Sequence, residues 1–254
     1  MFPFLKNHPF AVEAFFKSSL VVTFAVPKEE IQHLIPEPLR LDTFKDKWAF
    51  IAVAMVQTNN LRPKGFPRFL GNDFFLIGYR VFVRFTNNAG RNLRGLYILK
   101  SETDKTKMTF FGNMFTHYNY TTTDIKSTIE KDSLEFSSIK SGFKLKVERD
   151  DGKTISLPNE SPFADWSEAR RFAGPLPFTF TCTSAGKKVL IIEGVRENWK
   201  PAPVKVLSHS FSFLDNLKLK GIQLANAFLI DNIPYCWKKG KFEPWKREEV
   251  SRAR

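Results

Sequence analysis

Length, composition and charge already exclude several classes of protein. The chain has 254 residues, of which 43% are hydrophobic and 27 are phenylalanine, so it can bury a sizeable core and is not intrinsically disordered. No uncharged run reaches the roughly 20 apolar residues that a membrane-spanning helix needs, and the N-terminus lacks a secretory-signal pattern, so we expect a cytoplasmic protein with no membrane partner. The net charge of +13 would suit a nucleic-acid binder, but the excess gathers near the C-terminus, which favours a solvated tail.

The first half of the chain is expected to be rich in strands. Alternating and continuously apolar runs predict strands, and Pro27 both ends the first run and suits the first position of a short helix. A loop rich in Pro and Gly precedes a β-hairpin, whose turn Asn87-Asn88-Ala89-Gly90 tolerates positive φ. The expected strand, helix, strand, loop and two hairpin strands are, in order, residues 11–26, 27–35, 48–56, 61–72, 74–85 and 93–102.

The second half is expected to form a meander, a helix and further strands. Asp150-Asp151-Gly152 is the tightest turn signal of the meander. Ser161 is the expected N-cap of the helix, Pro162 its first residue and Gly174 its end. The expected strands are residues 133–139, 143–149, 153–157, 178–183 and 189–193, with a last one around 204–207.

The apolar pattern continues without a linker rich in Pro, Gly or Ser. We therefore expect a single domain over residues 1–245, followed by a basic C-terminal tail at 246–254. Phe, Val, Ile and Thr suit pleated strands, so the domain should be dominated by β-structure. A solid core is the commoner use of so many aromatic residues, and a hollow interior is the alternative.

The segment 110–120 concentrates polar groups behind an apolar run. His117 could act as a general base near neutral pH, with Tyr118 or Tyr120 as an acid or as a hydrogen-bond donor to a carbonyl or carboxylate. Thr116 and Asn119 are candidates for binding the substrate. Alternatively, these side chains only satisfy backbone groups at the end of the sheet.

The hairpin carries a second group of candidates. Lys100 and Glu102 are two residues apart, so in a strand they share a face and could both point into a pocket. Desolvated near Arg80, Lys100 could serve as an amine nucleophile, but the pattern favours a solvated salt bridge. Arg80, Phe82 and Arg84 also share a face, which could bind a carboxylate or face water.

Other catalytic and cofactor motifs are absent from the sequence. Cys182 and Cys236 form no CxxC pair, and no His-x-x-x-His spacing, phosphate loop or dinucleotide fingerprint is present. His209 lies in a small polar island without a Gly-x-Ser-x-Gly elbow, which disfavours a serine hydrolase. We therefore expect neither a metal nor a cofactor.

The order of the elements resembles a known family. The resemblance is carried by the run Leu34-Ile35-Pro36-Glu37-Pro38-Leu39-Arg40-Leu41-Asp42-Thr43-Phe44, the apolar run at 48–56 and Leu61-Arg62-Pro63-Lys64-Gly65, and it extends over 73–120 and more weakly to 208–211. This pattern resembles the YqjF-like bacterial family of unknown function, in the acetoacetate-decarboxylase-like superfamily. The resemblance implies an α+β, β-dominated fold: a cone-shaped antiparallel β-barrel with a few short helices and an internal pocket reached from one end.

The resemblance also locates the catalytic lysine of the decarboxylase, which forms a Schiff base with the keto acid. Its segment looks like Gly-Phe-Pro-Lys-Lys. If Gly112 is matched to its glycine, the two lysines fall on Phe115 and Thr116, so both are absent from this chain. Schiff-base decarboxylation by the same residue therefore does not carry over.

The leading prediction is a pocket protein that binds or acts on a small carbonyl- or carboxylate-bearing compound. His117, Tyr118 and Tyr120 are expected to line the closed end of the pocket. Whether the protein is an enzyme, with a cofactor-independent lyase-like activity, stays open, as does assembly into a homo-oligomer. The alternatives are a non-catalytic ligand-binding or sensor protein and, third, a basic nucleic-acid-associated protein, which is disfavoured.

Overall fold

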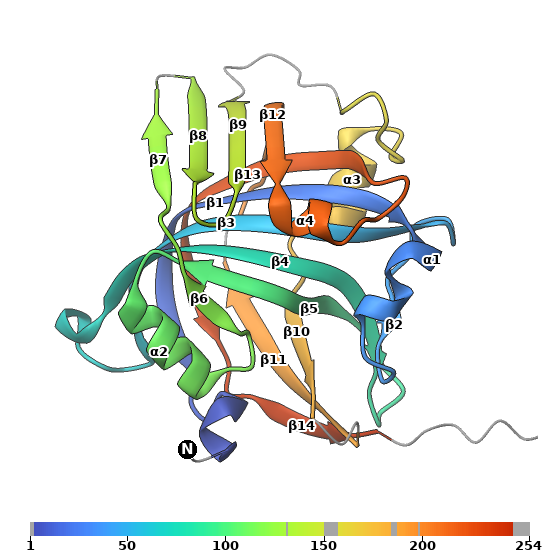
Figure 1. The fold of residues 1–254 in the computed structure, drawn as a ribbon. Helices are drawn as coiled ribbons and strands as arrows, with labels where there is room; N and C mark the ends of the chain where they lie inside the picture. The colour runs from blue at the N-terminus through green and yellow to red at the C-terminus, as the bar shows by residue number, and fades with distance from the viewer. Residues whose placement is uncertain (1–2, 131, 150–156, 184–186, 198, 246–254) are drawn as a thin grey trace, which may run out of the picture.

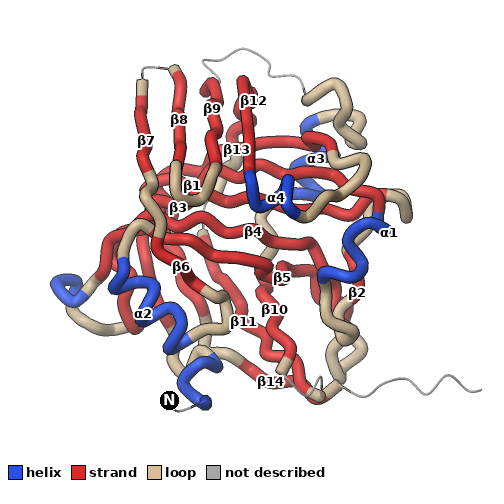
Figure 2. Tube along the Cα trace, viewed as in Figure 1, coloured by secondary structure: helices blue, strands red, loops and turns tan. Residues whose placement is uncertain are grey.

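The computed structural model describes residues 3–130, 132–149, 157–183, 187–197 and 199–245, and strands dominate it (Figures 1 and 2). The strands are β1 (Val12–Pro27), β2 (Arg40–Leu41), β3 (Trp48–Pro63), β4 (Asn72–Thr86), β5 (Asn92–Thr103), β6 (Tyr120–Thr122), β7 (Lys126–Ile129), β8 (Ser133–Ser138), β9 (Phe143–Arg149), β10 (Phe178–Cys182), β11 (Lys188–Arg196), β12 (Ala202–Phe211), β13 (Gln223–Trp237) and β14 (Lys241–Pro244). The α-helices are α1 (Lys28–Ile31), α2 (Thr106–Phe115), α3 (Trp166–Ala173) and α4 (Ser212–Asn216), and the 3₁₀ turns are η1 (Pro3–Asn7), η2 (Gln32–Leu34) and η3 (Arg68–Leu70). Among the described residues, no helix has the length and apolar character required to cross a bilayer.

Seven strands form a closed ring of hydrogen-bonded neighbours. The sheet order contains β11-β10-β5-β4-β3-β1-β13, and β11 also pairs with β13, which returns the path to its start. Most neighbours are antiparallel, but β5 pairs in parallel with β10 and with β6, so the purely antiparallel arrangement expected from the sequence is wrong at these two places. The chain crosses from β5 to β6 through α2, which is the connection that a parallel pair requires.

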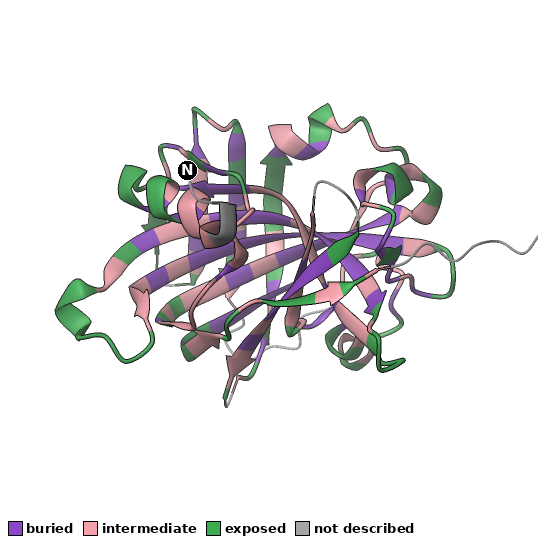
Figure 3. Cartoon of the chain, turned by 90° about the horizontal axis from the view of Figure 1, so that it is seen from below, coloured by how far each residue is buried: buried purple, intermediate pink, exposed green. Residues whose placement is uncertain are grey.

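The main hydrophobic core lies on the outer face of this ring. In Figure 1, β7, β8, β9 and β12 stand upright across the more horizontal strands β1, β3 and β4. Alternate residues of the ring strands, such as Val22, Val53 and Tyr79, pack with Phe136 and Leu145 of this second layer in one buried cluster. Figure 3 shows buried residues along the crossing strands and exposed ones on the protruding turns. Because these large side chains pack outward, the opposite face of each strand points into the ring.

The structure confirms most expected strands and corrects several boundaries. The strand expected at 48–56 continues to Pro63, so the loop begins later than expected. The helix expected from Ser161 begins at Trp166, because Asp165 provides the N-cap and accepts a hydrogen bond from the Glu168 backbone nitrogen at 2.8 Å. Sequence reasoning missed α2 and the long strand β13. The turn at 150–152, positions 153–156 of an expected strand and the tail at 246–254 lie outside the described residues.

Candidate functional site

A cavity of about 380 Å³ lies inside the ring, and all seven ring strands contribute residues to its lining. Its wall is apolar over most of its area. Small residues face it at the centre of the sheet, where Ala52 of β3 pairs with Arg80 of β4 and Ala54 pairs with Gly78. These small residues leave space at the centre of the ring, and the aromatic residues that also line the cavity, such as Phe82 and Trp237, surround this space without filling it.

One end of the cavity is closed by α2 and the segment that follows η1. The rings of Phe10 and Phe115 pack edge to face with centroids 5.1 Å apart, and the His8 backbone nitrogen donates to the Phe115 carbonyl oxygen at 3.1 Å. Phe10, Phe115 and Met108 all line the cavity. This contact fixes the helix against the start of the chain, residues far apart in sequence.

Arg80 is the charged centre of the cavity. Its Nε is fully buried without a hydrogen-bond partner, and Arg80 forms no ion pair with any described residue. Among the described residues that line the cavity there is no Asp, Glu or Lys. Burial lowers the pKa of Arg80, yet a guanidinium stays protonated at physiological pH. The cavity therefore holds a positive charge that no described lining residue neutralises.

Three tyrosines, Tyr118, Tyr120 and Tyr235, lie within electrostatic reach of Arg80 and line the same cavity. Burial raises the pKa of Tyr118 and raises the pKa of Tyr120 to about 12, so both hydroxyls keep their protons and can donate hydrogen bonds. The Tyr118 hydroxyl has no hydrogen bond of normal geometry to a described residue. A Cβ at Gly112 would overlap the Tyr120 ring, so the glycine of α2 permits this close packing.

Only some of the predicted site residues in the segment 116–120 line the cavity. Tyr118, Tyr120 and Thr116 line the cavity, whereas His117 and Asn119 do not, which corrects the expectation that His117 lines its closed end. Tyr120 pairs with Ser101 at the start of β6, and Ser101 also lines the cavity.

The remaining predicted residues of this segment have local partners or face solvent. His117 contacts Asn7, with 3.2 Å between Nε2 and Oδ1, and burial lowers the pKa of His117. Asn119 is exposed with a φ of 51°, as a tight turn requires. The Thr116 hydroxyl donates to the Gly112 carbonyl oxygen at 2.8 Å, which satisfies the end of α2.

Lys100 and Glu102 share a face, as expected, but that face points away from the cavity. Their ion pair measures 2.9 Å between Nζ and Oε1. The register of β4 with β5 shifts between Tyr79 and Arg80, which pair with Lys100 and Ile98 and leave Leu99 as a bulge. Leu96 and Ile98 line the cavity, so without this bulge strict alternation would have turned Lys100 and Glu102 inward.

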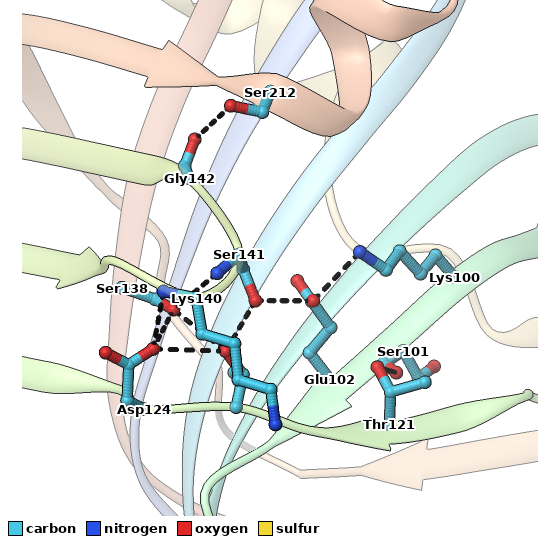
Figure 4. Close-up of polar contacts among 11 residues, drawn as sticks. Lys100, Ser101, Glu102, Thr121, Asp124, Ser138, Lys140, Ser141, Gly142 and Ser212 are labelled. Carbon is cyan, nitrogen blue, oxygen red and sulfur yellow. Dashed lines mark hydrogen bonds and ion pairs between the residues drawn. The ribbon is translucent and has the colours of Figure 1, made fainter.

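The ion pair belongs to a polar network between the ring and the second layer (Figure 4). Glu102 is only 3% exposed and accepts a hydrogen bond from the Ser141 hydroxyl at 2.6 Å. Ser138 donates to Asp124 at 2.6 Å, and this bond together with the Lys140 backbone nitrogen lowers the pKa of Asp124 to about 2. The salt bridge considered from the sequence is therefore buried at Glu102 and partly exposed at Lys100, and the hydrogen bond from Ser141 to Glu102 ties the turn after β8 to β5.

The polar residues of the cavity that sequence reasoning missed include His8, Arg196 and Tyr235. His8 is 6% exposed, its Nδ1 has no partner among the described residues, and burial lowers the pKa of His8 to about 4, so the imidazole is neutral. Tyr235 alternates with Ile233 and Trp237 along β13, a signal that could have identified it. Nothing local in the sequence marks His8 or Arg196.

The described residues could hold an anion more readily than a metal. No group of three or more His, Cys, Asp and Glu with a metal-binding arrangement occurs among them. A carboxylate beside Arg80 would gain charge-assisted hydrogen bonds from the guanidinium and further bonds from the tyrosine hydroxyls. A carbonyl oxygen at the same place would be polarised by the same donors.

Comparisons with known proteins agree with this architecture. The family DUF2071, described as an uncharacterized conserved protein, matches residues 14–234, and no curated protein matches the chain. An acetoacetate decarboxylase from Legionella pneumophila is similar with a TM-score of 0.57 and 12% identity, over 94% of this chain and 88% of that one. An acetoacetate decarboxylase-like enzyme from Sphingomonas wittichii has a TM-score of 0.55 and 11% identity, over 97% and 98%.

A third similar structure is the enduracididine biosynthesis enzyme MppR, in complex with the condensation product of pyruvate and imidazole 4-carboxaldehyde. It has a TM-score of 0.55 and 10% identity, over 92% of this chain and 89% of that one. At such identities the likeness shows the fold alone. It supports the acetoacetate-decarboxylase-like, β-dominated fold that the sequence resemblance implied.

Proposed function

We propose that this chain, which belongs to the DUF2071 family, binds a small organic acid inside the ring, with the carboxylate of the ligand at Arg80. The observation that carries the proposal is Arg80, whose Nε is buried without a hydrogen-bond partner and which has no ion pair to a described residue, in a cavity lined mostly by apolar groups. Burying a charge without a partner costs several kcal/mol. A site that keeps such a charge is explained by a ligand that neutralises it.

The tyrosines and the cavity wall define the rest of the ligand. Tyr118 and Tyr120 keep their protons, so they can donate to the second carboxylate oxygen or to a neighbouring carbonyl. The apolar wall suits a hydrocarbon body, and the volume of about 380 Å³ suits a small molecule. In this proposal the ring acts as the cone-shaped barrel implied by the superfamily and encloses the ligand.

The proposed binding is non-covalent. No lysine occurs among the described lining residues, and Lys100 is paired with Glu102 on the opposite face of β5. Borohydride treatment with a 2-keto acid should therefore leave the protein mass unchanged. A reduced adduct on any lysine would contradict this part of the proposal while leaving carboxylate binding intact.

The binding test compares carboxylates with neutral analogues of the same shape. We expect small alkyl and aryl carboxylates to bind, measured by titration calorimetry and by the fluorescence of Trp237, which lines the cavity. Their primary amides should bind about 10- to 100-fold more weakly, because a hydrogen bond to a charged group contributes about 1.5–3 kcal/mol. Equal affinity for acids and amides would contradict a role for Arg80 as the anchor.

Comparing Arg80→Met with Arg84→Met tests whether the preference for carboxylates over amides depends on Arg80 itself. Both arginines are on β4, but Arg84 pairs with Asp42 and does not line the cavity. Loss of the preference for acids in Arg80→Met alone supports the proposal. The same loss in Arg84→Met would point to a general effect of charge. Turnover of the bound acids, followed by NMR, then separates an enzyme from a binding protein.

A further inference from the structure

We infer that the ligand carries two acidic groups, and that Arg196 receives the second. This inference rests on the proposed function, because it places the first acidic group at Arg80. It commits to a dianion with an apolar spacer, for which a linear dicarboxylate is the simplest representative.

Arg196 lies where the ring closes. It is the last residue of β11 and stands directly opposite Tyr235 in the ladder between β11 and β13. One guanidinium nitrogen donates to the Pro175 carbonyl oxygen at 2.6 Å, and another lies 3.4 Å from the Tyr235 hydroxyl. The Nε atom is buried without a hydrogen-bond partner. Arg196 thus lines the cavity with part of its donor capacity unused.

The charges around the cavity do not balance. The third lining arginine, Arg62, has a carboxylate partner in Glu13 at 2.6 Å. Arg80 and Arg196 have none within the part of the chain that the structure describes, and His8 is neutral. The described lining therefore carries two uncompensated positive charges, which a ligand with two negative charges would neutralise.

Tyr235 lines the cavity together with both arginines, Arg80 and Arg196. Its hydroxyl lies 3.4 Å from an Arg196 nitrogen. Its ring is fixed by stacking on Phe16, with centroids 4.6 Å apart, and a Cβ at Gly194 would overlap its hydroxyl. Because Arg80 and Arg196 line one cavity of about 380 Å³, a single small ligand can contact both.

A purely structural role for Arg196 is the competing explanation. Its bond to the Pro175 carbonyl oxygen and its position 5.3 Å from the Trp199 ring centroid could serve only to hold the loop before β10. A structural role predicts that removing Arg196 disturbs all ligands equally. A ligand-binding role predicts that only the second acidic group loses its effect.

The experiment measures pairs of acids with the same chain length by titration calorimetry: butanoate with butanedioate, hexanoate with hexanedioate, and octanoate with octanedioate. In one of the three pairs, we expect the diacid to bind at least tenfold more tightly than its monoacid. The chain length of that pair then indicates the distance between the sites at Arg80 and Arg196. In Arg196→Met this ratio should fall to about one, and Arg196→Lys should retain part of it. Arg149→Met is the control, because Arg149 pairs with Asp231 and does not line the cavity.

The outcomes separate this inference from the proposed function. Equal binding of monoacids and diacids by the unmodified protein would contradict the inference that the ligand carries a second acidic group, but would leave Arg80 as the anchor of the first. An equal loss for both classes in Arg196→Met and Arg196→Lys assigns Arg196 to architecture and also overturns it. If neither class binds, the proposed function fails and the inference fails with it.

Discussion

Replacing Arg80 with methionine should make the ligand-free protein more stable while it abolishes the preference for carboxylates. Exchanging a buried charge for an apolar side chain of similar length is neutral or stabilising by up to about 4 kcal/mol. In this cavity the unpaired Nε and the small neighbours Ala52 and Gly78 leave room for a methionine without overpacking. We expect a gain of about 1–3 kcal/mol, since the cavity provides some polar surroundings.

The assay is urea unfolding of the ligand-free protein, with thermal unfolding as a second measurement. For a domain of this size the expected gain corresponds to a rise in Tm of roughly 2–10 °C. Arg84→Met is the matched control on the same strand. Its Nε contacts a carboxylate oxygen of Asp42 at 2.5 Å, and the Asp42 side chain is 0% exposed. Removing this partner should destabilise the protein by about 1–3 kcal/mol, allowing for the partly exposed Arg84 side chain.

The two variants should therefore shift stability in opposite directions. A destabilisation in Arg80→Met as large as that in Arg84→Met would refute the reasoning. It would mean that Arg80 already has a compensating partner in the folded protein and that its charge needs no ligand. The positive charge at Arg80 would then be part of the architecture.

Three further predictions concern groups around the cavity. The pKa of His8 is about 4 in the folded protein against an ordinary value of 6.5, so its contribution to stability is complete above pH 6.5 and falls by up to about 3 kcal/mol towards pH 4. Urea unfolding of His8→Phe should therefore show a weaker pH dependence between pH 6.5 and pH 4 than the unmodified protein. An equal loss of stability in the two proteins over this range would contradict the prediction. Gly112→Ala should displace the Tyr120 ring and reduce carboxylate affinity, whereas unchanged calorimetric affinity would separate that ring from binding. Lys100→Met should destabilise the protein by about 1–3 kcal/mol, because it leaves Glu102 buried with one fewer partner. Ligand affinity should be unchanged, and a reduced affinity would place the Lys100–Glu102 pair in the binding site.

Local pattern was sufficient for the hairpin and for part of the site. The Asn- and Gly-containing turn predicted β4 and β5, and period-two alternation predicted that Arg80 and Phe82 share a face. Both line the cavity. Tyr118 and Tyr120 were also identified from the sequence. The shared face of Arg80 and Phe82 could be predicted because alternation within a regular strand is a local property of the backbone, whereas a role of these residues in binding stays a prediction.

Lys100 forms the salt bridge that the sequence favoured, and it lies outside the cavity for an equally physical reason. A single extra residue at Leu99 changes which face every later residue of β5 presents. No turn residue or charge pattern in the sequence marks this bulge. His117 similarly lies beside Asn7 because the start of the chain packs against α2, a contact between segments far apart in sequence.

By itself, the sequence determined that the chain is β-dominated, where most strands lie, which superfamily it resembles, and that the matched lysines are absent. Only the tertiary structure decided which residues line the cavity and which of them lie side by side. The pairing of β11 with β13 brings Arg196 and Tyr235 opposite one another, and the register of β3 with β4 places small residues beside Arg80. These juxtapositions arise from hydrogen bonds between distant strands, whose register is set by the packing of the whole sheet rather than by neighbouring residues.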